Sequence, residues 1–133
     1  MRAKRIKTVS HAVRDINAAI AWYSDLLGMP KPQVTVNEGD GVKMATFRVG
    51  DGYIQLMEPI NNKGGIQKFL DERGEGLHHI TIQVDNTQEV REKLVKQGVR
   101  IVDSHAKEGD PMRSFWVHPL AGKGVLIEFS IRD

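Results

Sequence analysis

The stretch Thr8–Asp15 (TVSHAVRD) decides the fold, because His79–Asn86 (HITIQVDN) repeats its pattern of small, polar and apolar residues. A second pair of matching stretches follows in the same order, Tyr53–Met57 (YIQLM) and Leu126–Ser130 (LIEFS). Each pair has one member in each half of the chain. Self-similarity of this kind indicates a repeated structural unit. The sequence therefore predicts two diverged copies of one supersecondary unit.

Each half of the chain predicts a strand, a helix and three further strands. Apolar residues at helical spacing predict helices over Asp15–Leu27 and Thr87–Gln97, each followed by a glycine that stops it. Alternating or apolar runs between glycine-rich turns predict the strands. The predicted strands are Ile6–Val13, Gln33–Asn37, Lys43–Val49 and Tyr53–Glu58 in the first half, and Leu77–Val84, Val99–Asp103, Arg113–His118 and Gly124–Ile131 in the second.

This order of elements predicts an α+β fold in one domain, residues 1–133. A βαβββ unit is too small to bury its own sheet face, so two such modules are expected to pack together. We expect module one over about 1–60, a connector helix over about 64–74 and module two over about 76–133. The expected architecture is a curved mixed sheet around a central cleft.

The composition favours an ordinary globular domain and excludes several classes of function. Of 133 residues, 40% are hydrophobic and 27% are charged, with a formal net charge of +2. Basic residues this scattered do not indicate a nucleic-acid partner, although they suit an anionic small molecule. No apolar run reaches the roughly 20 residues of a membrane span, and the basic start lacks a signal peptide's apolar stretch. With no cysteine and nothing that points elsewhere, we expect a cytoplasmic protein with no membrane partner.

Strand alternation places Gln55, His79 and Glu128 opposite the apolar residues of their own strands. Such a polar face is costly unless it lines a wet or functional cavity, or forms the solvated side of an open sheet. The recurrence of polar residues at corresponding places in both halves favours the cavity. Imidazole, carboxylate and amide oxygen are suitable ligands for a divalent metal such as Zn²⁺, Co²⁺, Ni²⁺ or Mn²⁺.

Two further stretches are specific, Phe69–Ile80 (FLDERGEGLHHI) and the closing Gly124–Phe129 (GVLIEF). Other matching stretches extend the pattern over nearly the whole chain. They are Val13–Ile16, Trp22–Tyr23, Leu27–Gly28, Ile54–Pro59 and His118–Pro119. Together these residues resemble the vicinal oxygen chelate superfamily and, within it, the methylmalonyl-CoA epimerases.

The resemblance implies a metal site with one ligand from the first strand and one from the last strand of each module. By register, module two contributes His79 and Glu128, and the last strand of module one contributes Gln55. The fourth position, a histidine in the family, holds Thr8. Three protein ligands still permit a catalytic metal, and a metal-free site is the alternative. His11 faces the other way unless a bulge re-aims it, and a hydrogen-bonded core or interface histidine is its alternative role.

The activity that the resemblance implies is epimerisation assisted by divalent Co, Zn, Ni or Mn. The enzyme would remove and return the proton at the carbon between two carbonyls of an acyl-CoA or similar acid. Glu128 is the expected ligand and base. Glu38, the nearest carboxylate of the turn before the third strand, is the candidate second base, with an exposed turn residue as its alternative role.

Other activities remain open for this sequence. They are a glyoxalase I-type lyase, metal-free acid–base chemistry by His79 with Glu128, and small-molecule binding without catalysis, which Thr8 favours. Gln55 favours the epimerase, since glyoxalases have Glu or His there. The superfamily also implies a homodimer. Structural, lid or wall roles are expected for His78, His105, His118, Phe115, Trp116, Met44, Met57 and Met112.

Overall fold

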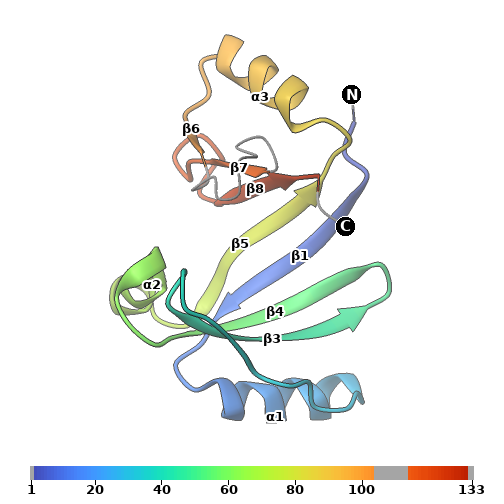
Figure 1. Cartoon of the computed structure of the whole chain (residues 1–133), viewed down its shortest axis with the longest axis vertical. Coiled ribbons are helices and arrows are strands. Elements are labelled where there is room, and N and C mark those ends of the chain that lie inside the picture. The colour runs from blue at the N-terminus through green and yellow to red at the C-terminus, as the bar shows by residue number, and fades with distance from the viewer. Residues whose placement is uncertain (1, 104–113, 132–133) are drawn as a thin grey trace. The chain divides into compact units, whose positions relative to one another are not determined.

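The structure is a computed structural model that describes residues 2–103 and 114–131. The chain divides into two compact units, a central unit, Val9–His78, and a terminal unit that joins Met1–Thr8 to His79–Asp133. The elements are β1 Arg5–Ala12, α1 Ile16–Leu27, β2 Thr35–Asn37, β3 Val42–Val49, β4 Gly52–Pro59, η1 Lys63–Gly65, α2 Ile66–Arg73, β5 Gly76–Gln83, α3 Thr87–Lys96, β6 Ile101–Asp103, β7 Ser114–Val117 and β8 Ile127–Ser130. This order of elements, most of which are labelled in Figure 1, confirms the two predicted βαβββ repeats.

The central unit contains an antiparallel sheet with the strand order β2-β3-β4. The longest pairing joins β3 to β4 and sets Thr46 opposite Gln55. The chain leaving β1 continues beside β4, where the backbone N–H of Val13 donates to the carbonyl of Met57 at 2.9 Å. This register decides which side chains accompany Gln55 on its face of the sheet.

The terminal unit has the strand order β5-β8-β7-β6. The pairing of β5 with β8 is parallel and sets Thr81 opposite Glu128, whereas β8 with β7 and β7 with β6 are antiparallel. A parallel pair needs a long crossover, and here α3, β6 and β7 lie in the chain between its two strands. The first and last strands of the second repeat therefore become neighbours.

The two repeats begin their helices in the same way. Asp15 is the N-cap of α1, and its side chain accepts a hydrogen bond from the backbone N–H of Ala18. Asn86 is the N-cap of α3 and accepts in the same way from Glu89. A short polar side chain at this position satisfies a backbone N–H that has no partner within the helix. The predicted α1 thus begins one residue late, with Asp15 as its cap.

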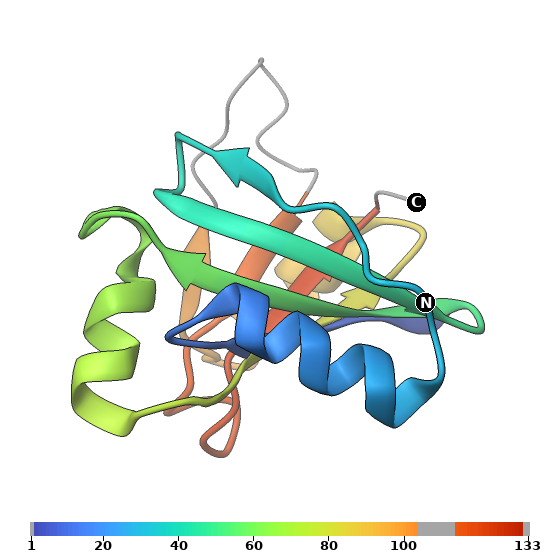
Figure 2. The same ribbon diagram turned by 90° about the horizontal axis from the view of Figure 1, so that it is seen from below.

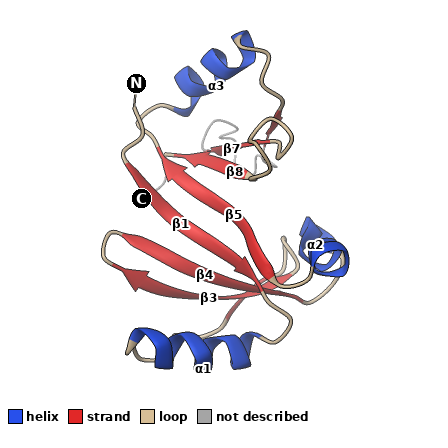
Figure 3. Ribbon diagram, turned by 180° about the vertical axis from the view of Figure 1, so that it is seen from behind, coloured by secondary structure: helices blue, strands red, loops and turns tan. Residues whose placement is uncertain are grey.

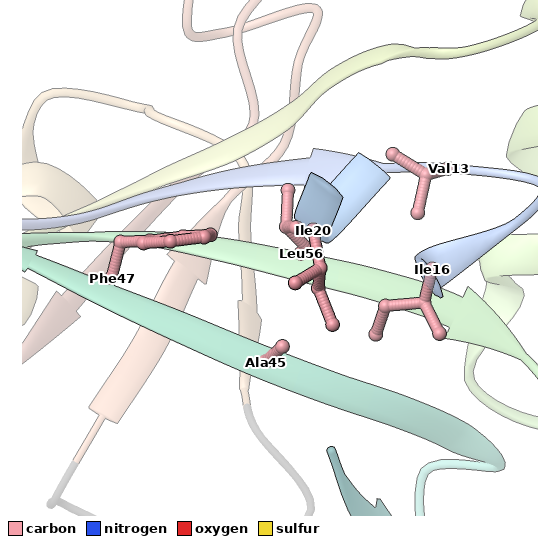
Figure 4. Close-up of a cluster of buried hydrophobic side chains, with 6 residues drawn as sticks. All are labelled: Val13, Ile16, Ile20, Ala45, Phe47 and Leu56. Carbon is pink, nitrogen blue, oxygen red and sulfur yellow. The ribbon is translucent and has the colours of Figure 1, made fainter. Parts of the chain in front are cut away.

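The core of the central unit lies between α1 and the β3–β4 sheet (Figure 4). Ile16 and Ile20 lie one helical turn apart and are buried against Leu56 and Phe47. A second cluster forms where Ile66 and Leu70 of α2 pack against Met57 and neighbouring side chains. Figure 2 shows α2 at the end of β4. Helices therefore contact both faces of this sheet.

The terminal unit has a smaller apolar layer among its described residues. The rings of Phe115 and Phe129 stack at a centroid distance of 5.3 Å. Helix α3 contacts β6 and β7 (Figure 3) but fully buries only Thr87. The predicted polar face of this sheet therefore lies opposite a stacked aromatic pair.

The closing strands are shorter than predicted. The sequence predicts strands over Arg113–His118 and Gly124–Ile131, but the segment between β7 and β8 folds into turns. The carbonyl of His118 accepts from Ala121 and Gly122, and Lys123 has a φ of 60°. These local bonds compete with strand pairing and shorten β8 at its start.

No helix in the described part of the chain is long and apolar enough to cross a membrane. The cytoplasmic location and the module boundaries expected from the sequence stay predictions.

Candidate functional site

The terminal unit brings His79, Thr81 and Glu128 onto one face of its sheet. Thr81 lies two residues after His79 on β5, and Thr81 is paired with Glu128 of β8. The Thr81 hydroxyl donates to Glu128 Oε1 at 2.9 Å. His79 and Thr81 are only 7% and 5% exposed. The imidazole and the carboxylate that the sequence predicts for module two therefore share one largely buried polar surface.

Trp116 belongs to the same surface. It is the register partner of Glu128, and its ring meets the His79 ring edge to face, with centroids 4.7 Å apart. Such a contact restricts the orientation of the imidazole. The sequence predicts a structural or lid role for the pair Phe115 and Trp116, and only Phe115 enters the core. Alternation along β7 puts Phe115 and Trp116 on opposite faces of the sheet. Only the pairing of β7 with β8 shows which of the two faces carries Glu128.

In the central unit, Gln55 is held by two neighbours on its own face. The Ser10 hydroxyl donates to Gln55 Oε1 at 3.0 Å, and Gln55 Nε2 contacts Met44 Sδ at 3.4 Å. A thioether sulfur is a weak acceptor, so it favours the N–H₂ side of the amide over the oxygen. The amide oxygen therefore lies on the Ser10 side.

The remaining first-module position, Thr8, is half-buried and lies two residues before Ser10 on β1. His11 has the opposite orientation, since its Nδ1 lies 2.8 Å from the hydroxyl of Tyr23 on α1. Burial raises the pKa of Tyr23 above its ordinary value of 10.0. The alternative role for His11, a hydrogen-bonded structural histidine, is thus the one the structure supports.

Glu38 lies in the turn between β2 and β3, where its side chain is exposed. The turn is closed by Asn37, which accepts from the backbone N–H of Asp40 at 3.0 Å and also donates to the Asp40 carboxylate. A Cβ at Gly41 would lie 2.1 Å from the Asn61 side chain, so this turn is sterically confined. The second-base role of Glu38 stays a prediction.

His78 faces away from the candidate site, as strand alternation predicts. Its ring lies edge to face against Phe69 of α2 at 5.1 Å, and the Arg73 guanidinium lies over the same Phe69 ring. Burial first, and then the charge of Arg73, lower the pKa of His78 from 6.5 to about 4. His118 is structural as well, since its Nδ1 accepts from Leu120 N–H.

The methionines within the described residues have the packing roles expected of them. Met57 is part of the core under α2, and Met44 lines the surroundings of Gln55. His105 and Met112 lie outside the described residues.

The side chains of the terminal unit fit a divalent metal in donor chemistry. Imidazole nitrogen and carboxylate oxygen are common ligands of Zn²⁺, Co²⁺ and Mn²⁺, and His79 and Glu128 share a face. Across residues 2–103 and 114–131, no group of three or more His, Cys, Asp or Glu gathers into a metal cluster. The predicted set contains only two residues of those types, because its third member is Gln55 and the fourth position holds Thr8.

Comparisons with known proteins show the family to which the chain belongs. Residues 9–116 match the Glyoxalase/Bleomycin resistance protein/Dioxygenase superfamily. The mitochondrial methylmalonyl-CoA epimerase of Mus musculus is 30% identical over 128 residues, which cover 93% of this chain and 71% of the mouse protein. The crystal structure of methylmalonyl-CoA epimerase from Mycobacterium tuberculosis has a TM-score of 0.81 and 35% identity, covering 96% of this chain and 87% of that one.

A methylmalonyl-CoA epimerase solved in complex with methylmalonyl-CoA and NH4+ has a TM-score of 0.79 and 27% identity, covering 96% of this chain and 94% of that one. These relatives are isomerases, and their structures confirm the α+β fold class that the repeat predicts. The chain therefore belongs to the Glyoxalase/Bleomycin resistance protein/Dioxygenase superfamily, among relatives that are methylmalonyl-CoA epimerases.

Proposed function

We propose that this protein is an epimerase that inverts the carbon between the thioester carbonyl and the carboxylate of methylmalonyl-CoA or a similar acyl-CoA. The observation that carries the proposal is the Glu128 carboxylate, which shares a largely buried sheet face with His79 and accepts from Thr81 at 2.9 Å. A fixed carboxylate is a suitable group for moving a proton at a carbon flanked by two carbonyls. The methylmalonyl-CoA epimerases among the relatives support this choice of substrate.

In this proposal Glu128 takes the proton from the acidic carbon, and the electrons of the broken C–H bond move into the thioester carbonyl. A second acid returns a proton to the opposite side of the same carbon, which inverts its configuration. Glu38 is the proposed second group, on the strength of the resemblance. One proton leaves the substrate for Glu128 and one arrives from the second acid, so the substrate neither gains nor loses a proton overall. The two groups exchange roles in the reverse direction.

Gln55, His79 and Glu128 are the residues that would hold a divalent Co, Zn, Ni or Mn ion. Such an ion supplies Lewis-acid stabilisation of the negative charge that develops on the substrate oxygen atoms. Gln55 would contribute a neutral amide oxygen, and the contacts with Ser10 and Met44 set which side of the amide carries that oxygen. Thr8 stands where the family has an imidazole, so we expect weaker metal binding than a site with two histidines gives.

Incorporation of solvent deuterium into methylmalonyl-CoA, followed by NMR, tests the proposal. The reaction is run with added Co²⁺ and again with a chelator. We expect rapid exchange that requires the metal, and a loss of about 10²–10⁴-fold in Glu128→Gln. The matched control is Glu92→Gln on the exposed side of α3, which should exchange like the wild type.

Other outcomes would point to the other activities. Exchange that persists unchanged in the chelator would favour metal-free acid–base chemistry by His79 and Glu128. No exchange in either condition would contradict the epimerase, and turnover of a hemithioacetal would then indicate a glyoxalase-type lyase. Ligand affinity that survives alanine at Gln55, His79 and Glu128 would indicate a binding protein.

The homodimer implied by the superfamily is part of the proposal. Trp22 and Leu26 lie one helical turn apart on α1 and are 60% and 61% exposed. A second copy that covers them would remove apolar surface from water. Sedimentation should show a dimer, and Trp22→Glu should shift it toward monomer, whereas a wild-type monomer would contradict this part of the proposal.

A further inference from the structure

The two modules contain the same hydrogen bond at equivalent positions. In the central unit the Ser10 hydroxyl donates to Gln55 Oε1 at 3.0 Å, and in the terminal unit the Thr81 hydroxyl donates to Glu128 Oε1 at 2.9 Å. Each bond runs from the first strand of a module to its last strand. The two residues of each bond also belong to the same unit of the chain.

The sequence repeat makes the four residues two equivalent pairs. When Thr8–Asp15 is aligned with His79–Asn86, Ser10 corresponds to Thr81. When Tyr53–Met57 is aligned with Leu126–Ser130, Gln55 corresponds to Glu128. In both modules the donor therefore lies two residues after the first-strand ligand position. In both modules the acceptor is the last-strand residue of the predicted ligand set.

Both donors are buried, Ser10 at 0% and Thr81 at 5% exposure. A buried hydroxyl without a partner is destabilising, whereas Ala or Val would fill the same space at no such cost. Here each hydroxyl binds an oxygen of a long, rotatable side chain. Glu and Gln lose much rotamer freedom on being ordered, so a fixed donor beside each one limits the positions that its oxygens can take.

We infer that Ser10 and Thr81 are positioning residues that orient the functional oxygens of Gln55 and Glu128. The inference rests on the proposed function to the extent that Gln55 and Glu128 form the site. Neither hydroxyl is assigned a contact with the substrate. The Met44 contact assists Ser10 by holding the other side of the Gln55 amide.

The first test needs no ligand, substrate or metal. The side-chain scalar couplings of Glu128 are measured by NMR in the wild type, in Thr81→Val, which keeps the shape but lacks the hydroxyl, and in Thr81→Ser, which keeps the hydroxyl. We expect one dominant rotamer in the wild type and in Thr81→Ser, and averaged couplings in Thr81→Val. A single unchanged rotamer in a folded Thr81→Val protein would overturn the inference.

The central pair is tested by the side-chain amide signals of Gln55. Ser10→Ala should shift these signals and average them, while the backbone signals of β3 and β4 remain in place. Unchanged Gln55 signals would overturn the inference for this module. Thr35→Val, on an exposed position of β2, is the matched control for a lost threonine hydroxyl and should change neither Gln55 nor Glu128.

The second test measures the consequence for the site. Calorimetry with Co²⁺ should show about 10- to 100-fold weaker binding in Thr81→Val, the range known for groups that orient metal ligands, and recovery in Thr81→Ser. The kcat for deuterium exchange should fall by a similar factor in Thr81→Val, while KM should change little. If Thr81→Val bound Co²⁺ and exchanged deuterium like the wild type while Glu128→Gln was inactive, the inference would be overturned. The proposed epimerase activity would then still stand. A wild type without exchange would contradict the epimerase alone, since the couplings still decide the role of Thr81.

Discussion

The central and terminal units use one arrangement of side chains but give it different chemistry. The central unit pairs Ser10 with the neutral amide of Gln55, whereas the terminal unit pairs Thr81 with the carboxylate of Glu128. The two repeats also differ at the first-strand position, which is Thr8 in the first repeat and His79 in the second, although both residues belong to the terminal unit. The repeat therefore preserves the positions of the predicted site, and the two ionisable residues at those positions, His79 and Glu128, both lie in the terminal unit.

The packing of the two units differs in the opposite direction. In the central unit, α1 buries Ile16 and Ile20 in a cluster with the sheet. In the terminal unit, α3 buries only Thr87, and its Val95 is 50% exposed. Since burial of apolar side chains supplies most of the favourable free energy of folding, we expect the central unit to be the more stable of the two. Substitutions in each unit test this division between stability and chemistry.

The largest expected effect is on catalysis and compares the two acceptor residues. Glu128→Gln should reduce deuterium exchange by about 10²–10⁴-fold, because it removes the proposed base. Gln55→Leu should cost less, because the amide only binds and orients. Measured rates at saturating substrate decide the comparison. If Gln55→Leu were the more damaging change, the assignment of proton transfer to the terminal unit would be wrong.

The next effect is on stability and has the opposite order. Leu56→Ala in the central core, where Leu56 is 0% exposed, should lower the free energy of unfolding by about 2–5 kcal/mol. Ile127→Ala on the partly exposed β8 should cost less, since less surface returns to water. Urea unfolding of both variants gives the values. Equal losses would remove the expected difference in packing.

A third effect depends on pH and concerns His78. Its pKa falls from 6.5 to about 4 in the folded protein through burial and the charge of Arg73. As the pH falls below 6.5, the unfolded chain takes up a proton that the folded chain binds only near pH 4, so stability is lost in this window. We expect about 1–3 kcal/mol of this acid-dependent loss to disappear in His78→Phe, which keeps a ring against Phe69.

Unfolding curves of wild type and His78→Phe at pH 7 and pH 4.5 measure this effect. The difference between the proteins removes the contribution of the carboxyl groups, which titrate in both. Parallel pH profiles would mean that His78 is solvated and free to charge in the folded state.

The smallest expected effect sharpens the comparison at the first-strand position. Thr8→His restores the imidazole that His79 supplies in the second repeat, and should raise Co²⁺ affinity about tenfold by adding a nitrogen ligand. Calorimetry of the metal alone measures it, with Thr35→His as the control. An unchanged affinity would show that position 8 does not reach the metal.

Much of the fold could be predicted from the sequence because its elements follow local rules. The spacing of Ile16 and Ile20 and the cap at Asp15 depend on residues a few positions apart. The start of β8 could not be predicted in this way. Val125 and Leu126 are apolar like strand residues, but turns that begin at His118 occupy the chain before them.

The candidate site was only partly predictable. Strand alternation was sufficient to place Gln55 and Glu128 on the polar faces of their strands. The donors Ser10 and Thr81, and the contact of Trp116 with His79, depend on pairing between strands far apart in the sequence. Alternation gives the face of each strand but not the register between strands.

The division of the chain into units has a consequence for the order of folding. The central unit is one continuous stretch, Val9–His78, whereas the terminal unit needs both Met1–Thr8 and His79–Asp133. The bond from Lys4 N–H to the Gln83 carbonyl must wait for the intervening chain and closes a long loop. During synthesis on a ribosome, all residues of the central unit have been added to the chain before β5 and β8 are complete. We expect β3 and β4 amides to become protected from hydrogen exchange before those of β5 and β8, so the stable half would be in place before the half that carries the chemistry.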